Sequence, residues 1–342
     1  EDRFAARGAR LTPLVGRETE GAMLDARWSQ AKGGEGQAVL LSGEPGIGKS
    51  RIVQELRARV GDEPHFRLRY QCSPYFAHSA FHPFVEQLSR AAGFAADDDP
   101  EAKLDKLEAL LSQAADQVGD VAPLLAAILG LPGDRYVALD ADPQRRKEGT
   151  IAALAEQLAG LAEHRPVLLI FEDTQWIDST SLEVLDALVA RIENIPVLIL
   201  ISYRPEFQPP WAGLGHVTML SLNRLGRREC AAIAAKVPGG AALPDSVLDQ
   251  IVARTDGVPL FAEELTRSVV EAGLAAEGDD PQAGRDSAAR FAIPSSLRDS
   301  LTARLDRLGP AKEIAQIGAV IGSPFEHRLL ARVSPLPPSQ LE

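Results

Sequence analysis

Residues 43–50 read GEPGIGKS and match the phosphate-binding pattern G-x-x-x-x-G-K-[ST] at every fixed position. The apolar run QAVLLS (37–42) comes directly before this stretch and is typical of a buried parallel strand. Residues 49–60 follow it and are expected to form a helix. A glycine loop between a strand and a helix binds phosphate through backbone N–H groups and the helix N-terminus. The sequence therefore predicts a nucleotide site at this loop.

Strands alternate with helices along the first two thirds of the chain. Four further segments are typical of strands: 65–72, 166–171, 196–202 and 216–222. Helices are expected at 17–31, through most of 80–163 with breaks near 93, 97–100 and 129–134, and at 178–192. Asp178 and Ser179 offer N-cap oxygens to the last of these, and Glu183 lies one turn in. The alternation predicts an α/β fold in which helices cover both faces of a five-stranded parallel sheet.

The strand pattern ends near residue 222, and only helices are expected beyond it. They lie at 226–236, 244–254 and 259–273, before a polar stretch at 275–290 that is typical of a linker. Two amphipathic helices are expected from Ile293 onwards. We therefore predict a nucleotide-binding domain at 1–222, a helical domain at 223–290 and the start of a further domain at 291–342. The chain begins without Met and ends abruptly, which favours a piece of a longer protein.

Composition narrows the class of protein. The chain has 36 Lys and Arg and 48 Asp and Glu, so its net charge is −12. This acidic charge argues against nucleic-acid binding, because affinity for nucleic acid depends on basic residues. The two cysteines lie far apart, so the sequence favours a reducing cytoplasm over a disulfide framework. No apolar run approaches the roughly 20 residues that cross a bilayer, and the N-terminus lacks an apolar signal-peptide core.

Candidate catalytic groups follow two of the expected strands. Lys49 is expected to contact the β- and γ-phosphates, and Ser50 to place its hydroxyl on Mg²⁺. Glu172 and Asp173 end the third strand, where one carboxylate holds Mg²⁺ and the other orients or deprotonates the attacking water. Their spacing does not show which acid holds Mg²⁺ and which acts on the attacking water. Arg204 follows the fourth strand at the same edge and is expected to contact the γ-phosphate, unless it is an ordinary surface arginine.

Five motifs together resemble the STAND class of P-loop NTPases, the signal-transduction ATPases related to AAA+ proteins. They are PLVGRE (13–18), GEPGIGKS (43–50), FEDTQWID (171–178), YRPEF (203–207) and DGVPLFAEELTR (256–267). The set is similar, more narrowly, to the ATPase region that follows the catalytic domain of bacterial class III adenylate/guanylate cyclases. RYQCSPYFAHSAFHPFVEQL (69–88) is the stretch that most favours this subgroup.

The resemblance implies roles for matching positions. Val15, Gly16 and Arg17 would lie near the adenine and ribose, and Pro259 would pack against the adenine from the helical domain. Pro259 is also explained by an ordinary helix that begins with proline. Glu172 and Asp173 would be the Walker B acids and, with Ser50, the Mg²⁺ ligands. The nucleotide would lie along Gly43, Glu44, Pro45, Gly46, Ile47, Gly48, Lys49, Ser50 and Arg51. Residues 291–342 would begin a winged-helix domain.

Other residues suggest weaker hypotheses. His78 and His82, near Cys72, have the spacing of metal ligands on a helix, but packing or surface roles are favoured. Arg145 or Arg146 is a candidate arginine finger for a neighbouring subunit, against a solvated helix face. Trp176 either marks a partner surface or packs its turn.

Four functions are compatible with these features. The favoured function is a regulatory switch that binds ATP or ADP with Mg²⁺ and hydrolyses ATP slowly. The switch would control an effector domain of the same full-length chain, expected to be a nucleotide cyclase. Self-association or binding to a protein partner is also expected as an option. The alternatives are an oligomeric AAA+ remodelling ATPase with fast turnover and a nucleotide-dependent LuxR-type transcription regulator. A phosphotransferase is also compatible with the loop, but no acceptor pocket is legible. No guanine-reading motif is present, which favours ATP.

Overall fold

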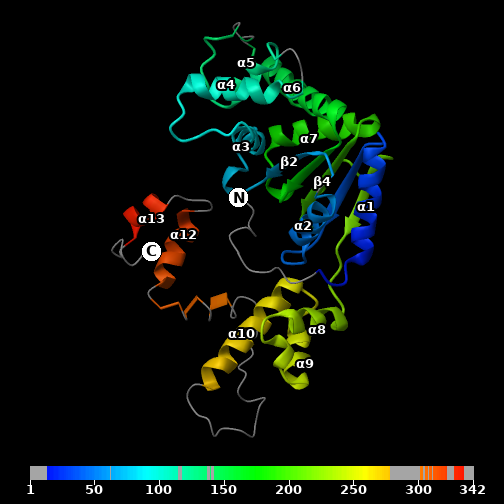
Figure 1. Cartoon of the computed structure of the whole chain (residues 1–342), viewed down its shortest axis with the longest axis vertical. Coiled ribbons are helices and arrows are strands. Elements are labelled where there is room, and N and C mark those ends of the chain that lie inside the picture. The colour runs from blue at the N-terminus through cyan, green and yellow to red at the C-terminus, as the bar shows by residue number, and fades with distance from the viewer. Residues whose placement is uncertain are drawn as a thin grey trace. The chain divides into compact units, whose positions relative to one another are not determined.

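A five-stranded parallel sheet forms the centre of residues 17–223, which we call the sheet unit (Figure 1). A computed structural model describes residues 14–61, 63–114, 118–136, 139, 142–277, 301–302, 305–306, 308–309, 311–321 and 327–334. The strands are β1 (Gln37–Ser42), β2 (Phe66–Gln71), β3 (Val167–Glu172), β4 (Val197–Tyr203) and β5 (Val217–Ser221). Their order is β2-β3-β4-β1-β5, and every pair is parallel. The predicted α/β fold is therefore confirmed.

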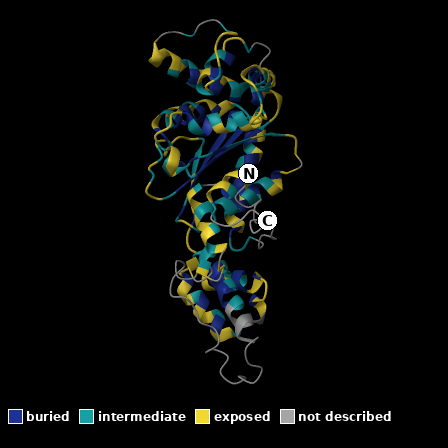
Figure 2. Cartoon of the chain, turned by 90° about the vertical axis from the view of Figure 1, so that its left-hand side faces the viewer, coloured by how far each residue is buried: buried dark blue, intermediate teal, exposed yellow. Residues whose placement is uncertain are grey.

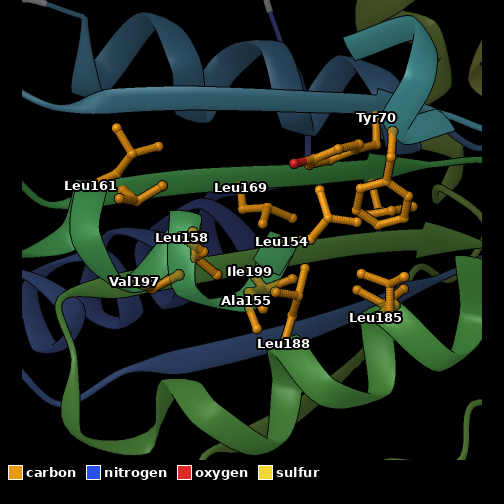
Figure 3. Packing of buried hydrophobic residues seen from close by; sticks show 14 of the residues in the cluster. Tyr70, Leu154, Ala155, Leu158, Leu161, Leu169, Leu185, Leu188, Val197 and Ile199 are labelled. Atoms are coloured by element: carbon orange, nitrogen blue, oxygen red, sulfur yellow. The ribbon is translucent and has the colours of Figure 1, made fainter. Parts of the chain in front are cut away.

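Helices cover both faces of the sheet (Figure 1). Helices α1 (Glu18–Lys32) and α2 (Lys49–Val60) lie on one face, and α3 (His82–Ala91), α6 (Pro143–His164) and α7 (Ser179–Arg191) lie on the other. Alternate residues of the strands, such as Leu169 and Ile199, pack against Leu158 of α6 and Leu188 of α7 (Figure 3). Because both faces are covered, β3 and β4 are buried along their whole length, as Figure 2 shows in dark blue.

Two local predictions need correction. The stretch 80–163 also contains α4 (Pro100–Leu111) and α5 (Ala122–Ile128), and the break between these two was not predicted. Helix α7 is capped by Asp178 alone, whose Oδ1 accepts a hydrogen bond of 2.9 Å from the Ser181 N–H. Ser179 is already inside the helix, and Glu183 forms an ion pair of 2.8 Å with Lys147 instead of supporting the cap.

The rest of the described chain forms a second unit, which we call the helical unit. It contains α8 (Arg227–Lys236), α9 (Asp245–Thr255), α10 (Pro259–Glu277), α12 (Ala311–Ile321) and α13 (His327–Val333). Leu243, Val247, Ile251, Leu265 and Val269 form a small core between α9 and α10. Helix α10 continues two residues past the predicted start of the linker, and residues 278–300 lie outside the described residues.

The units meet in sequence after Asn223, next to the predicted boundary after residue 222, while residues 14–16 belong to the helical unit. The division into three domains, with a winged-helix domain from 291, stays a prediction. None of the helices that the structure describes is long and apolar enough to cross a membrane.

Candidate functional site

The loop between β1 and α2 has a backbone that favours glycine. Gly46 and Gly48 have φ angles of 78° and 106°, which residues with a side chain rarely adopt. No heavy atom lies within 4 Å of the position that a Cβ on Gly48 would take. A Cβ on Gly43 would instead lie 2.7 Å from Cγ2 of Ile47. The loop is therefore tightly packed at its start and open at its end, where the backbone is accessible to phosphate oxygens.

Lys49 directs its ammonium back into this loop. The side chain is buried, and Nζ donates hydrogen bonds of 2.6 Å to the Gly43 carbonyl and 3.0 Å to the Glu44 carbonyl. Burial lowers the pKa of Lys49 by penalising the charged form. The charge of Asp173 acts in the opposite direction, and that of Arg204 lowers the pKa further. Lys49, Asp173 and Arg204 are therefore close enough to interact electrostatically.

The two acids at the end of β3 are held by side chains of β2. Glu172 is only 4% exposed, and its Oε2 accepts a hydrogen bond of 2.7 Å from Nε of Arg69. Asp173 follows with a φ of 58° and is half-buried. One of its carboxylate oxygens accepts a hydrogen bond of 2.9 Å from Nε2 of Gln71. Since Asp173 is the acid that acts on the Lys49 pKa, the two acids have different surroundings despite being adjacent.

Arg204 lies at the tip of β4, beside the turn that follows β3. Its backbone N–H donates to Oε1 of Gln175 over 3.2 Å, and Nε2 of Gln175 donates to Asp173 over 3.4 Å. Its guanidinium carbon lies 4.8 Å from the ring centroid of Trp176. The carboxyl ends of neighbouring parallel strands thus bring Lys49, the two acids and Arg204 to one edge of the sheet.

Arg17 connects the start of α1 to the phosphate loop. Its guanidinium is buried and donates hydrogen bonds to the carbonyl of Asn223 (2.6 Å), to the carbonyl of Ile47 (3.4 Å) and to Glu20 (2.9 Å). These contacts support the loop from behind. A role for Arg17 at the adenine or ribose stays a prediction.

The remaining predicted residues fall into two groups. Ser50 and Arg51 are half-buried in the first turn of α2. Val15, Gly16 and Pro259 belong to the helical unit, where a Cβ on Gly16 would lie 2.6 Å from Cγ of Glu229. Pro259 is the first residue of α10, as an ordinary proline at a helix start would be. The predicted contacts of this second group with the base stay predictions.

Sequence reasoning missed Arg69, Gln71 and Gln175, which contact the acids or Arg204. The sequence signal for these residues was the alternation of polar and apolar residues in β2, because Arg and Gln on one face of an edge strand indicate a role other than core packing.

The metal hypothesis gains no support, since no group of three or more His, Cys, Asp or Glu residues in the described ranges could hold an ion. The ring of His82 instead stacks on Phe76 at 3.7 Å between centroids. Cys72 is buried and free, and burial raises the pKa of its thiol.

A parallel sheet with a glycine-rich phosphate loop after β1, and acids at the end of a neighbouring strand, defines a P-loop NTPase. The family model described as "AAA ATPase domain" matches residues 13–201. The chain therefore belongs to the AAA ATPase domain family, whose members are AAA+ P-loop NTPases that act through a bound nucleotide.

Three known proteins illustrate what the chain is similar to. An uncharacterised protein of Rhizobium meliloti (strain 1021) is 32% identical over 339 residues, which is 98% of this chain and 32% of that protein. The chain thus spans about a third of the length of this relative. The Aeropyrum pernix Orc1 protein, solved in complex with DNA, is 13% identical with a TM-score of 0.50 and covers 90% of this chain and 69% of that one. Cdc6p of Pyrobaculum aerophilum is 14% identical with a TM-score of 0.48, over 80% and 66% of the two chains. At such low identity the Orc1 match concerns the fold alone.

Proposed function

We propose that this AAA ATPase domain is a regulatory switch that holds ATP or ADP, hydrolyses ATP slowly and belongs to a larger signal-transduction protein of the STAND class. The observation that carries the proposal is the restraint on both acids at the end of β3. Glu172 is ion-paired with Arg69, and Asp173 accepts a hydrogen bond from Gln71. An acid whose oxygens are already occupied is a weaker base toward water, which favours slow turnover.

The phosphate loop fits a nucleoside triphosphate. The positive φ angles of Gly46 and Gly48 and the open space at Gly48 leave backbone N–H groups accessible. Lys49 would exchange its hydrogen bonds to loop carbonyls for bonds to the β- and γ-phosphates. Ser50 and the acids Glu172 and Asp173 are oxygen ligands of the kind that Mg²⁺ prefers, and the ion would neutralise phosphate charge.

The arrangement divides the work between the acids. Because Glu172 is nearly inaccessible and paired with a cation, it is suited to hold an outer position in the metal site and orient its neighbours. Asp173 is more exposed and is close to the Lys49 charge. We assign to Asp173 the role of orienting or deprotonating the attacking water, which the sequence alone left open.

The conformational change that transmits the nucleotide state would occur in domains other than the sheet unit. We propose that the phosphate state sets how the helical domain (223–290) and a winged-helix domain (from 291) dock on the nucleotide domain, by order–disorder or hinge motion. The chain covers a third of its Rhizobium relative, which leaves room for an effector domain. The resemblance to cyclase-linked ATPase regions makes a nucleotide cyclase the proposed effector. A cytoplasmic location and self-association through this domain are part of the same proposal.

A single-turnover assay separates this proposal from its alternatives. The purified chain would be mixed with labelled ATP and Mg²⁺, and cleavage and ADP release would be followed separately. A switch predicts slow cleavage with ADP retained, and Lys49→Ala should abolish binding. Rapid cleavage with free ADP release would refute the switch and favour a remodelling ATPase. A DNA-binding regulator would instead retard a DNA probe at low salt, which the net charge of −12 argues against.

A further inference from the structure

The guanidinium of Arg204 lies over the indole of Trp176, the last residue of the 3₁₀ turn η3 (Thr174–Trp176) after β3. The distance of 4.8 Å from the guanidinium carbon to the ring centroid is within the range of a cation–π contact. The Trp176 ring is half-buried and packs against the main core cluster of the sheet unit. A packed ring cannot swing away with the arginine, so it restricts where the guanidinium can lie.

The contact leaves the hydrogen-bond donors of Arg204 available. In the described part of the chain, the guanidinium has no hydrogen-bond or ion-pair partner, and the group that it contacts is the Trp176 ring. A stacked guanidinium uses its flat face, while its five N–H groups point outward in the plane. Such a group can donate two parallel hydrogen bonds to a phosphate without leaving the ring.

The turn that carries Trp176 is fixed to the acids. The Trp176 N–H donates to the Asp173 carbonyl over 3.1 Å. Gln175 contacts Asp173 with its side-chain nitrogen and the Arg204 backbone with its side-chain oxygen. The backbone that carries the ring is therefore bonded to Asp173, and the turn is bonded to the tip of β4. Burial is the main cause of the lowered pKa of Lys49, and the charge of Arg204 lowers this pKa further, so Arg204 interacts electrostatically with the lysine of the phosphate loop.

We propose that Trp176 is a positioning residue that presents Arg204 to the γ-phosphate and so raises the preference of the site for ATP over ADP. This inference rests on the proposed nucleotide site and adds a second residue to the recognition of the third phosphate. ADP lacks that phosphate, so the Trp176 ring contributes nothing to ADP affinity. The indole acts by preorganisation, because an arginine already held in place loses less freedom when phosphate binds.

The test is the ratio of the dissociation constants for ADP and for a non-hydrolysable ATP analogue, measured by calorimetry on the full chain with Mg²⁺. Trp176→Leu should reduce this ratio roughly 2- to 5-fold, the size of a solvent-accessible cation–π contact, with ADP affinity unchanged. Trp176→Phe, which keeps an aromatic face, should retain most of the ratio. In the Arg204→Ala background, Trp176→Leu should have no further effect.

An unchanged ratio in Trp176→Leu, or equal losses for both nucleotides, would overturn the positioning role. If wild-type chain bound neither nucleotide, the proposed function itself would fail, and the two failures are thereby distinguished. A second measurement does not depend on Trp176→Leu. The chain has three tryptophans, and 5-fluorotryptophan labelling gives each a ¹⁹F resonance, with that of Trp176 assigned from Trp176→Phe.

The Trp176 resonance should shift in Arg204→Ala, and it should differ between the ADP and ATP-analogue complexes only when Arg204 is present. A Trp176 resonance that ignores Arg204→Ala would refute the contact on which the inference depends. The resonance of Trp211 is the internal control, because its Nε1 donates to Asp186 over 2.6 Å, whereas the cation–π contact of Arg204 is with Trp176.

Discussion

Replacing Gly48 by alanine tests whether the backbone of the loop binds phosphate. The φ angle of Gly48 is 106°, so the substitution forces a residue with a Cβ into a left-handed conformation, at a cost of about 1–2 kcal/mol. No protein atom lies within 4 Å of the new methyl group, so no clash adds to that cost. The methyl group instead takes up open space on the loop, where we propose that the phosphates lie.

Gly93 provides the matched control. It lies after α3, its φ angle is 67°, and a Cβ there also meets no atom within 4 Å. Gly93→Ala should therefore lose a similar 1–2 kcal/mol of unfolding free energy (about the same left-handed penalty). The two variants differ in their position, because Gly48 lies in the phosphate loop and Gly93 lies outside it. Stability measured by urea unfolding should fall alike in both.

Nucleotide affinity should separate the two variants. Gly48→Ala should lose at least one charge-assisted hydrogen bond to phosphate, worth about 1.5–3 kcal/mol, which corresponds to roughly 10- to 100-fold in the dissociation constant for ADP. Gly93→Ala should bind ADP as the wild type does. Calorimetric titration measures both. If Gly48→Ala bound ADP with wild-type affinity while losing stability like Gly93→Ala, the loop would not be the phosphate site.

Three further predictions follow from contacts elsewhere in the sheet unit. Arg69→Met leaves the buried Glu172 carboxylate without its cation and should lower the free energy of unfolding by about 3–5 kcal/mol. Adding Glu172→Gln in a double variant should restore much of this loss, whereas additive losses in urea unfolding would show that the two residues are not coupled. Asp173→Asn should keep ATP affinity but slow single-turnover cleavage roughly 10²-fold or more, whereas an unchanged rate would move the base to Glu172. Gly36→Ala would drive a methyl group into a backbone carbonyl before β4, so soluble yield should collapse, while Gly215→Ala, which meets open space, should express normally.

Most of the sheet could be read from the sequence because central parallel strands are buried on both faces. Such strands are short apolar runs, and QAVLLS was placed at β1 to the residue. The helices between residues 80 and 163 were harder to separate. The chain is not helical at residues 112–114 and 118–121, between α4 and α5, and the sequence from 112 to 121 contains one glycine, Gly119, and no proline. A single glycine does not distinguish an interruption from a tolerated helical residue.

The sequence predicted the parts of the site whose residues are close together along the chain. The phosphate loop is eight consecutive residues, so its pattern is complete in the sequence. The contacts that restrain the acids are not local, since Arg69 and Glu172 are 103 positions apart and meet only because β2 and β3 pair in parallel. The sequence placed Arg204 at the same edge as the acids, but it could not show that Trp176 lies under the guanidinium.

The surroundings of Lys49 and Arg204 explain why they would contribute differently to the choice between ATP and ADP. Lys49 already donates to two carbonyls, so binding phosphate exchanges hydrogen bonds that exist for others. It would also contact the β-phosphate, which ADP shares. In the described residues, Arg204 has no such bonds to give up, and it would meet only the γ-phosphate. A ligand shifts a conformational equilibrium only by its differential affinity for the two states. Lys49 should therefore determine whether a nucleotide binds, and Arg204 which one.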